Sequence, residues 1–559
     1  MEKIKPNLIF AVLGGLILAF SLPFFGLGWL VFFALILLFV FLEIRPQKAF
    51  STGFWFGLVY FLFVFRWFWD TYPLEGLGFE NHYLAAGLIA FAWLLTALAM
   101  SFLWATAFWL FKKIEKKTSW TSLIVFPSIF VWFEYLRSFI ISILWFSPGN
   151  TISPDWTAGN LAYNLHANTL ILKLSSLLGI YGVTFFVALA AVLIFLFLEK
   201  RQYKKLWIFI AVLTSLSYFP FDWFVPSNNN AEKIKVAVIQ SYIPSKKNYS
   251  PQEQLSFFKK QLELMNKISR EEPETKLIVF PEASNFFTNI SLFGNTLNVG
   301  LFFNNLFSSK TAIIDNSHIQ ENFLKKSKTI YLDSKSGVVG DYDKKLLTPG
   351  GEYAPYLFRL LDKVLGIDSE ELKNFEELQS GHQPPSAINF PNLTEDSPQV
   401  GVGALVCSDI SSPSLARNIS LSGGQLIAVQ GSFAFANGSK DLIRQVKAMA
   451  SLRAAENNKY LIYAANYGPS FVVSGSGKIS REASETGFDP SLGTDLHSRA
   501  ESTYPFQVQG FQILTGDIVL NSKKTLYNKL GDWPILLASL SVLIASSFQV
   551  LGSRHDKII

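Results

Sequence analysis

The first 224 residues of this chain are an almost unbroken succession of apolar stretches with short polar breaks between them. A helix of ~20 apolar residues, or ~17 at the least, crosses the hydrocarbon core of a bilayer. Seven stretches here approach that length and an eighth stands near the end of the chain, at about residues 7–22, 27–42, 49–65, 84–111, 122–141, 174–198, 206–221 and 533–551. We therefore expect a polytopic α-helical membrane domain with about eight transmembrane helices.

The positions of lysine and arginine predict how these helices are oriented. If there are eight spans, the basic loops all fall on one side of the membrane, and they contain Lys3, Lys5, Arg45, Lys48, Lys112, Lys113, Lys116, Lys117, Lys200, Arg201, Lys204, Lys205, Arg554 and Lys557. The loop 66–82 on the other side balances Arg66 with three acidic residues. By the positive-inside rule, both termini are expected in the cytoplasm, and the long region before the last span is expected outside it.

The composition changes after residue 224, where the chain begins to resemble an ordinary globular domain. Apolar strand patterns at 233–244, 276–284, 329–353, 399–410 and 459–479 alternate with helical patterns at 251–270 and 440–458. This alternation predicts a layered α/β domain. We expect three parts: a transmembrane domain at 1–224, a soluble domain at 225–532, and a final helix with a short tail at 533–559. The net charge of +6 does not indicate a nucleic-acid partner, because loop lysines account for much of it.

Two ionisable residues, Glu134 and Arg137, lie inside the fifth apolar stretch. A spacing of three places them on one face of a helix, where they can pair. Charged groups inside a span are costly and usually face protein or a water-filled cavity. The pair is interpreted either as a structural ion pair or as part of a polar site for a lipid headgroup.

The chain has one cysteine, Cys407, at the end of the apolar run "VGALVCSDI". A lone cysteine is often only a small buried hydrophobe, and it excludes an intrachain disulfide. Two other reactive groups also stand at strand ends: Glu282, and the adjacent pair Lys344 and Lys345. A thiol requires a base to become a nucleophile, and a nearby ammonium stabilises an oxyanion. Glutamate, lysine and cysteine together are therefore a complete set for acyl transfer.

Histidine is the commoner base for a cysteine nucleophile, but the three histidines of the soluble region are poorly placed for that role. His318, His382 and His497 are all expected in polar loops rather than at strand ends. The two neighbouring lysines cannot both face the site, because side chains alternate between the two faces of a strand. Strand alternation alone does not decide between Lys344 and Lys345.

The segments "FPEAS", "YDKKLLTPGGEY" and "LVCSDI", in this order, resemble the nitrilase, or carbon–nitrogen hydrolase, superfamily. Such a domain between seven upstream spans and one downstream span is similar to the apolipoprotein N-acyltransferase family of bacteria. The resemblance covers nearly the whole chain and includes "VWFEYLRS" and "AVIQSYIP". It implies an αββα sandwich for the soluble domain.

The resemblance also implies a role for each site residue. Cys407 corresponds to the nucleophile, Glu282 to the general base and Lys344 to the cation that stabilises the oxyanion. Lys344 is favoured over Lys345 because the family has Tyr-x-Lys before its Pro-x-Gly-Glu turn. Glu352 and Asp409 are expected to support the site, and Glu352 can alternatively be an exposed turn carboxylate. No metal and no diffusible cofactor is implied.

The reaction implied by the resemblance has two steps and takes place at the bacterial inner membrane, on its periplasmic side. A phospholipid first gives its acyl chain to Cys407 as a thioester. The N-terminal amine of a diacylglyceryl-cysteine lipoprotein then accepts that chain, and the enzyme is expected to act as a monomer. Two alternatives stay open: a membrane-tethered amidase for a small substrate, and a non-enzymatic transporter or lipoprotein-binding protein.

Several positions depart from the family pattern or permit two interpretations. Leu346 and Ser408 replace the usual residues near the lysine and the cysteine, and "VQGSFAFAN" (429–437), which contains Gln430, replaces the usual downstream motif. The apolar segments 284–307, with Phe286 and Phe287, and 352–367 either contact the membrane or face the core. The polar stretches 366–398 and 480–510 are expected to be lids or disordered loops.

Overall fold

The computed structural model describes most of the chain, with gaps between the described ranges. These ranges are residues 6–74, 81–115, 117–218, 232–245, 249–293, 302–303, 305–307, 310–366, 370–373, 375–391, 393, 399–483, 507–508 and 511–542. Most of the stretch 480–510 and part of 366–398, where loops are expected, lie outside the described residues.

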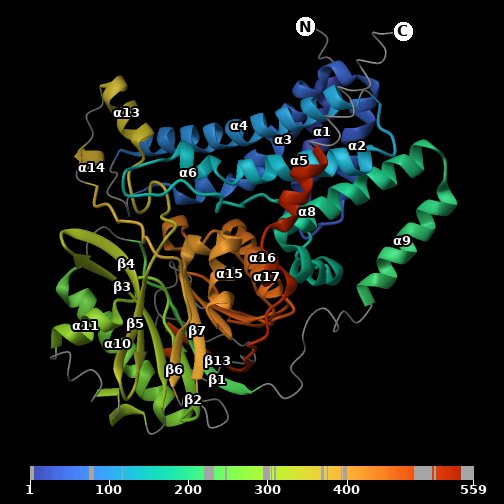
Figure 1. Ribbon diagram of the computed structural model, residues 1–559. Helices are drawn as coiled ribbons and strands as arrows, with labels where there is room; N and C mark the ends of the chain where they lie inside the picture. The colour runs from blue at the N-terminus through green and yellow to red at the C-terminus, as the bar shows by residue number, and fades with distance from the viewer. Residues whose placement is uncertain are drawn as a thin grey trace, which may run out of the picture.

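A layer of long apolar helices forms one side of the molecule (Figure 1). The layer contains α1 (Pro6–Phe20), α2 (Leu30–Ile44), α3 (Ala49–Val64), α4 (His82–Ile114), α5 (Ser122–Arg137) and α8 (Thr169–Glu199), together with the short α6 (Ile140–Leu144). Helix α9 (Tyr203–Tyr218) follows α8 and points away from the layer (Figure 1). Four helical segments within the described residues are long and apolar enough to cross a membrane: Pro46–Thr71, His82–Ile114, Ser122–Leu144 and Thr169–Glu199. Three shorter apolar helices accompany them, so the protein is a membrane protein, and the count of eight spans stays a prediction.

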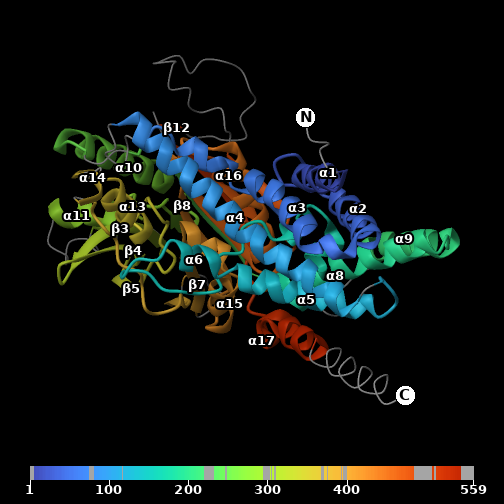
Figure 2. The ribbon, with the colours of Figure 1, turned by 90° about the horizontal axis from the view of Figure 1, so that it is seen from above.

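Helix α4 is longer than a bilayer requires. Its 33 residues extend about 50 Å at 1.5 Å per residue, whereas the hydrocarbon core is only about 30 Å thick. The first turns of α4 contact the soluble domain, where Ala85 packs with Ala354 and Leu372. From above, α4 runs over the α/β domain toward the end of the helical layer that holds α2 (Figure 2). One end of α4 is therefore available to shape a site in the soluble domain.

The α/β domain is built on a sheet with the strand order β5-β4-β3-β2-β1-β9-β8-β7-β6. The strands on this path are β1 (Lys233–Ser241), β2 (Thr275–Val279), β3 (Ala312–Glu321), β4 (Leu324–Asp333), β5 (Gly337–Asp343), β6 (Ile388–Pro391), β7 (Gln399–Val406), β8 (Leu426–Ser432) and β9 (Tyr460–Asn466). β10 (Phe471–Val473), β11 (Ile479–Glu482), β12 (Gln507–Val508) and β13 (Phe511–Val519) pair beside this path.

The sheet folds into two halves that meet at a narrow joint. Strands β1 and β9 share only the residue pair Ser241 and Asn466. Side chains from both halves, such as Val236 of β1 and Ala404 of β7, pack in one buried apolar core between them. The long apolar runs of these strands are explained by burial on both faces.

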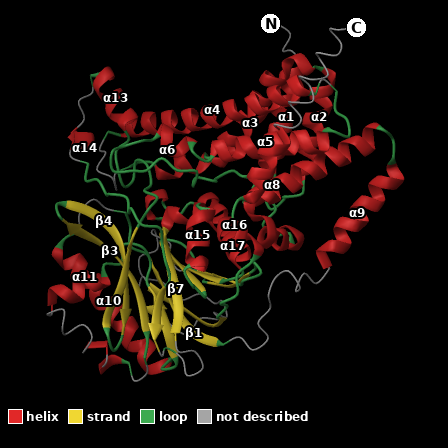
Figure 3. Ribbon diagram, in the orientation of Figure 1, coloured by secondary structure: helices red, strands yellow, loops and turns green. Residues whose placement is uncertain are grey.

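Helices cover the outer face of each half (Figure 3). α10 (Pro251–Glu271) and α11 (Phe286–Phe293) cover the half that contains β1 to β3, with Phe258 and Phe286 in their core. α15 (Pro413–Leu421) and α16 (Lys440–Asn457) cover the half that contains β7 to β9. The order helix, sheet, sheet, helix confirms the expected nitrilase-like αββα fold.

The second helical cover also joins the soluble domain to the membrane helices. Buried side chains of α16 belong to the same apolar core as those of α8 and α5. The short helix α17 (Leu526–Leu530) packs there as well, and the ring of Tyr527 lies against Gly179 of α8. Gly179 has φ +63°, which interrupts α8 with a kink. The two parts of the protein therefore share one continuous interior.

One expectation about local structure is wrong, because strand and helix faces cannot be assigned from composition alone. His318 lies within β3 rather than in a polar loop. Phe286 is fully buried against Phe280 and Phe258, so this end of segment 284–307 faces the core and not a membrane. By contrast, residues 356–365 form α13 (Tyr356–Leu365), in which Tyr356, Leu360 and Val364 are exposed along one face.

Candidate active site

The ends of three strands bring Glu282, Lys344 and Cys407 together. Glu282 follows β2, Lys344 directly follows β5, and Cys407 directly follows β7. The Lys344 Nζ atom lies 2.8 Å from Glu282 Oε1, and Cys407 lies near enough to Glu282 for each group to influence the pKa of the other. Lys345 points away and donates to the carbonyl of His382 at 3.1 Å. Of the two lysines, Lys344 is the one in the site.

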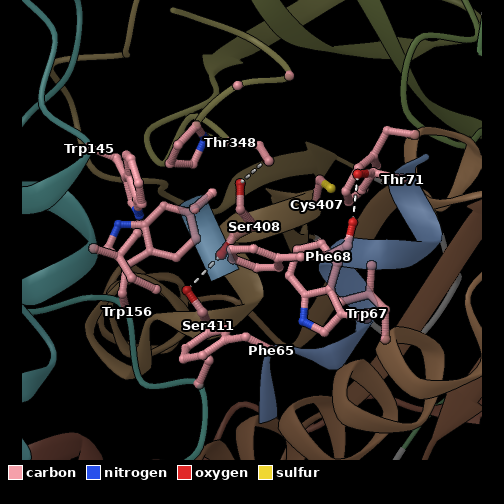
Figure 4. A pocket seen from close by; sticks show the side chains of 18 of the residues that line it. Phe65, Trp67, Phe68, Thr71, Trp145, Trp156, Thr348, Cys407, Ser408 and Ser411 are labelled. Atoms are coloured by element: carbon pink, nitrogen blue, oxygen red, sulfur yellow. Dashed lines mark hydrogen bonds between the residues drawn. The ribbon is translucent and has the colours of Figure 1, made fainter. Parts of the chain in front are cut away.

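The backbone holds Cys407 in an unusual conformation. Its φ of +48° is in the left-handed region, which is uncommon for a residue with a side chain. Such a conformation persists only where the surrounding structure fixes it, and it frequently marks a functional site. The sharp turn after β7 directs the sulfur into a cavity, as Figure 4 shows.

Lys344 is held between two carboxylates. Besides Glu282, it contacts Glu352, with Nζ 2.8 Å from Glu352 Oε2. Glu352 also accepts a hydrogen bond of 2.7 Å from the backbone N–H of Thr348, which fixes the turn that carries it. Glu352 is therefore a part of the site and not a free turn carboxylate.

Burial and charge set the protonation of this group. Burial by itself lowers the pKa of Lys344, but Glu282 and Glu352 raise the pKa well above its ordinary value, so the ammonium stays charged. Burial raises the pKa of Cys407, and the Glu282 charge raises it further, so the resting thiol is neutral. Burial also raises the pKa of Glu282. A neutral thiol thus lies beside a carboxylate of increased basicity.

Asp409 ties the turn that carries Lys344 to the turn that carries Cys407. It accepts hydrogen bonds from Tyr342 Oη at 2.9 Å, from the Leu346 N–H at 2.8 Å and from the Val406 N–H at 3.0 Å. Burial raises the pKa of Asp409 to about 6, against the lowering effect of the Leu346 N–H. Its contacts indicate that Asp409 sets the distance between Lys344 and Cys407.

The atypical positions have structural partners. Leu346 is fully buried, and its carbonyl accepts a hydrogen bond from Ser408 Oγ. Gln430 lies inside the sandwich, where it accepts from Thr329 Oγ1 at 2.7 Å and donates to the Phe280 carbonyl at 2.8 Å. Gln430 thus connects the two halves of the sheet rather than contacting the reacting groups.

The charges of Lys344 and Glu352 both influence the pKa of His318. Burial, with a contribution from Lys325, lowers its pKa to about 4. A histidine with so low a pKa is a weak base. The geometry therefore supports Glu282, not His318, as the proton acceptor for the thiol.

Cys407 lies on the wall of an apolar cavity of about 210 Å³, which is partly open to its surroundings. Its lining combines membrane-side and soluble-domain residues: Phe65, Trp67, Phe68, Leu88, Ala92, Ile141, Trp145, Trp156, Phe358, Phe375, Phe433, Phe435 and Met449 are among them. Figure 4 shows several of these aromatic rings around Cys407 and Ser408. The cavity thus connects the thiol with the helical layer.

Sequence reasoning missed most of this lining. Trp145, for example, packs against Phe358 in the cavity wall. The segment "FRWFWD" (65–70) supplies Phe65, Trp67 and Phe68, and its density of aromatic residues was the one available signal. An aromatic cluster by itself does not indicate which distant segments it meets.

The chain matches two family models in succession. Residues 14–193 match the apolipoprotein N-acyltransferase N-terminal domain, and residues 235–489 match the carbon-nitrogen hydrolases. An apolipoprotein N-acyltransferase of Geobacter metallireducens is 25% identical over 99% of this chain and 97% of its own length. That of Aquifex aeolicus is 26% identical over 84% of this chain and 94% of its own length.

Two solved structures match about half of the chain. An amidase from Nesterenkonia sp. AN1 shares 18% identity, has a TM-score of 0.31, and covers 45% of this chain and 89% of its own. Saccharomyces cerevisiae Nit3, of the nitrilase superfamily, shares 17% identity and has a TM-score of 0.34. The match covers 52% of this chain and 92% of the Nit3 chain.

The two family matches lie in the order expected from the sequence, and the relatives align with both the helical layer and the α/β domain. Over nearly its whole length the chain is therefore similar to the apolipoprotein N-acyltransferase family.

Proposed function

We propose that this membrane protein transfers a fatty acyl chain from a phospholipid to the N-terminal amine of a diacylglyceryl-cysteine lipoprotein. One observation carries the proposal: the Cys407 thiol, beside Glu282 and Lys344, opens into an apolar cavity whose walls include the membrane helices. A cavity of this kind fits an acyl chain, because burying each CH₂ group contributes about 0.8 kcal/mol.

In the first step, Glu282 accepts the proton of the Cys407 thiol, and the thiolate attacks the ester carbonyl of the phospholipid. Lys344 stabilises the negative charge on the carbonyl oxygen of the tetrahedral intermediate. The bond between the acyl carbon and the glycerol oxygen then breaks. That oxygen takes the proton from Glu282 and leaves as a lysophospholipid, so a thioester remains on Cys407.

In the second step, the neutral amine of the lipoprotein attacks the thioester carbonyl and transfers a proton to Glu282. The intermediate expels the Cys407 thiolate, which takes the proton back from Glu282. The products are an amide and a free enzyme. Because the first product leaves before the acceptor reacts, the two substrates follow ping-pong kinetics.

The membrane setting proposed here follows the distribution of loop cations. Both termini are placed in the cytoplasm, and the catalytic domain lies on the periplasmic side of the inner membrane, where the two lipid-anchored substrates are available. The division at residues 224 and 532 and the monomeric state belong to the same proposal. The small-substrate amidase is less well supported, because a polar amide does not require an apolar cavity that includes membrane helices.

The direct test uses the purified full chain in detergent micelles with phosphatidylethanolamine and a diacylglyceryl peptide. We expect the peptide to gain the mass of one acyl chain, at its amine, and to gain none with Cys407→Ser. Hydrolysis of a soluble amide with no acylated peptide formed would support the amidase instead and overturn the proposal.

A further inference from the structure

The strained turn at Cys407 is held from two sides. On the side of the soluble domain, Asp409 binds the backbone of Val406 and Leu346, and Ser408 donates to the Leu346 carbonyl. The other side of the turn continues through residues 411–414, which face the membrane domain. A positive φ at a residue with a side chain is costly, so both sides contribute to keeping the thiol in place.

A loop between the membrane helices holds this second side. We define the connector loop as residues 155–160, which lie between α6 and α8. Asp155 Oδ1 accepts hydrogen bonds from Ser412 Oγ at 2.5 Å and from Ser414 Oγ at 2.9 Å, and its carbonyl accepts from Ser411 Oγ at 3.0 Å. Thr157 Oγ1 also donates to the Ser411 carbonyl. The connector loop therefore holds the segment that follows Cys407 through hydrogen bonds.

Buried ionisable residues of α5 hold the other end of the connector loop. Arg137 forms a two-pronged ion pair with Glu134 and donates to the Ala158 carbonyl at 2.6 Å. Asn160 Nδ2 donates to Glu134 Oε2 at 3.0 Å. The side chains of Glu134 and Arg137 are fully buried. The pair thus has protein partners, which favours its interpretation as a structural ion pair over a site for a lipid headgroup.

These contacts are stronger than the average contact in a protein. Hydrogen bonds to a charged group are roughly twice as strong as hydrogen bonds between neutral groups. Glu134 also accepts from Trp104 Nε1 at 2.6 Å, which ties the pair to α4. Because a packed ion pair with all its partners has one geometry, it provides a rigid attachment for the loop.

We infer that Asp155 is a positioning residue for the Cys407 nucleophile, and that the connector loop fixes it to the Glu134–Arg137 pair. The membrane domain would then set the placement of the thiol relative to Glu282 and Lys344. The role in acyl transfer rests on the proposed function, whereas the placement of the thiol does not. Asp155 itself is not a catalytic residue, because it contacts the chain after Cys407 and not the reacting atoms.

The test compares four forms of the full chain: wild type, Asp155→Ala, Asp155→Asn and Asp70→Ala. Asp155→Asn keeps the Oδ1 acceptor. Asp70→Ala is the matched control, because Asp70 also accepts from a serine of the soluble domain, Ser439, but away from residues 411–414. Two rates are measured: alkylation of Cys407 by iodoacetamide, which is specific because the chain has one cysteine, and acyl transfer from phosphatidylethanolamine.

We expect Asp155→Ala to slow both reactions about tenfold or more, as the loss of one or two charge-assisted hydrogen bonds predicts. For acyl transfer, kcat falls while the KM for phospholipid stays unchanged. Asp155→Asn restores most of the rate, and Asp70→Ala leaves it near wild type. Combining Asp155→Ala with Arg137→Lys, which cannot bind Glu134 and the Ala158 carbonyl together, costs less than the product of the two single effects.

The inference is overturned if Asp155→Ala matches wild type per folded molecule, if only KM changes, or if Asp70→Ala is equally slow. A fully multiplicative double variant contradicts the attachment to Arg137. If wild type is alkylated but never acylated by phospholipid, the proposed function fails. The alkylation rates of the variants then still decide the positioning role.

Discussion

At the scale of single residues, the site depends on one ammonium that two carboxylates share. Lys344 contacts Glu282 and Glu352 at the same distance of 2.8 Å. One positive charge cannot fully neutralise two negative ones, so the group keeps an excess negative charge beside the thiol. Burial and the Glu352 charge both raise the pKa of Glu282, although Lys344 lowers it. This arrangement gives the carboxylate the basicity that a thiol requires.

The acid limb of Cys407 alkylation should report the pKa of Glu282. As the pH falls, Glu282 becomes protonated and cannot accept the thiol proton. Because the pKa of Glu282 is raised, the alkylation rate should fall at a pH above the ordinary pKa of a glutamate. Glu352→Gln removes a negative charge, which lowers the pKa of Glu282 and moves the acid limb to lower pH. Asp409, with a pKa of about 6, does not contact Glu352, so its contribution stays in place. A shift to higher pH would contradict this account.

The two adjacent lysines offer a matched pair of variants. We expect Lys344→Ala to lower the rate of acyl-enzyme formation by about 10²–10³, because one oxyanion-stabilising group is lost. Lys345→Ala should retain most of the rate, since its ammonium binds only the His382 carbonyl in the described structure. Single-turnover acylation measures both. Equal losses in the two variants would show that the assignment of Lys344 is wrong.

At the residue scale, the sequence could identify the reactive groups but not their partners. Glu282, Lys344 and Cys407 each stand beside an apolar strand run, which is visible in the sequence. The choice of Lys344 over Lys345 came from the family resemblance, because strand alternation shows only that the two lysines cannot both face the site. The anchoring of Cys407 by Asp155 depends on a loop some 250 residues upstream, and no local pattern encodes that contact.

At the scale of secondary-structure elements, the kink in α8 connects the membrane helices to the soluble domain. Gly179 has φ +63° and ψ −177°, a conformation that only glycine adopts readily. A Cβ atom there would lie 2.5 Å from the ring of the buried Tyr527 in α17. The kink thus allows α17 to approach α8 closely.

Gly179→Ala should destabilise the protein by at least about 2 kcal/mol, through backbone strain and overlap with Tyr527. Gly87→Ala in the exposed part of α4 is the control, because a Cβ there meets nothing within 4 Å. Alanine in a helix interior is more favourable than glycine, by about 0.5–1 kcal/mol. Thermal midpoints in detergent compare the two. A Gly179→Ala protein as stable as wild type would contradict the packing described.

Element type was predictable where the apolar pattern was long, and the facing direction was not. The long apolar helices and the alternation of strands with helices follow from hydrophobic periodicity. His318 was misplaced because a short polar run does not reveal whether it belongs to a strand or to a surface loop. For Phe286 the sequence left both core and membrane open, and packing against Phe258 of α10 decides for the core.

At the scale of the whole molecule, the cavity depends on both parts of the protein. Its walls combine helix α4 and the side chains of Phe65, Trp67, Phe68 and Thr71 with the turns that carry Cys407 and Phe433. None of these segments alone forms a closed apolar space. The sequence predicted the two parts but not the cavity, because its lining comes from segments hundreds of residues apart.

Filling the cavity should separate lipid chemistry from thiol chemistry. Ala92 of α4 lines the cavity, so Ala92→Trp should lower acyl transfer from phosphatidylethanolamine by about tenfold or more, because the indole fills space that the acyl chain needs and the two together overpack the cavity. Alkylation by the small reagent iodoacetamide should change little. Leu94→Trp, on the exposed side of α4, is the control. Equal acyl transfer in both variants would show that the acyl chain does not occupy this cavity.

The most direct test of the central claim is the mass of the peptide that contains Cys407, from protein purified out of its own membranes. We expect a fatty-acyl adduct that hydroxylamine removes, as it removes thioesters, and that is absent from Cys407→Ser and strongly reduced in Glu282→Gln and Lys344→Ala. An unmodified thiol that still fails to charge when phospholipid is supplied would contradict acyl transfer through Cys407.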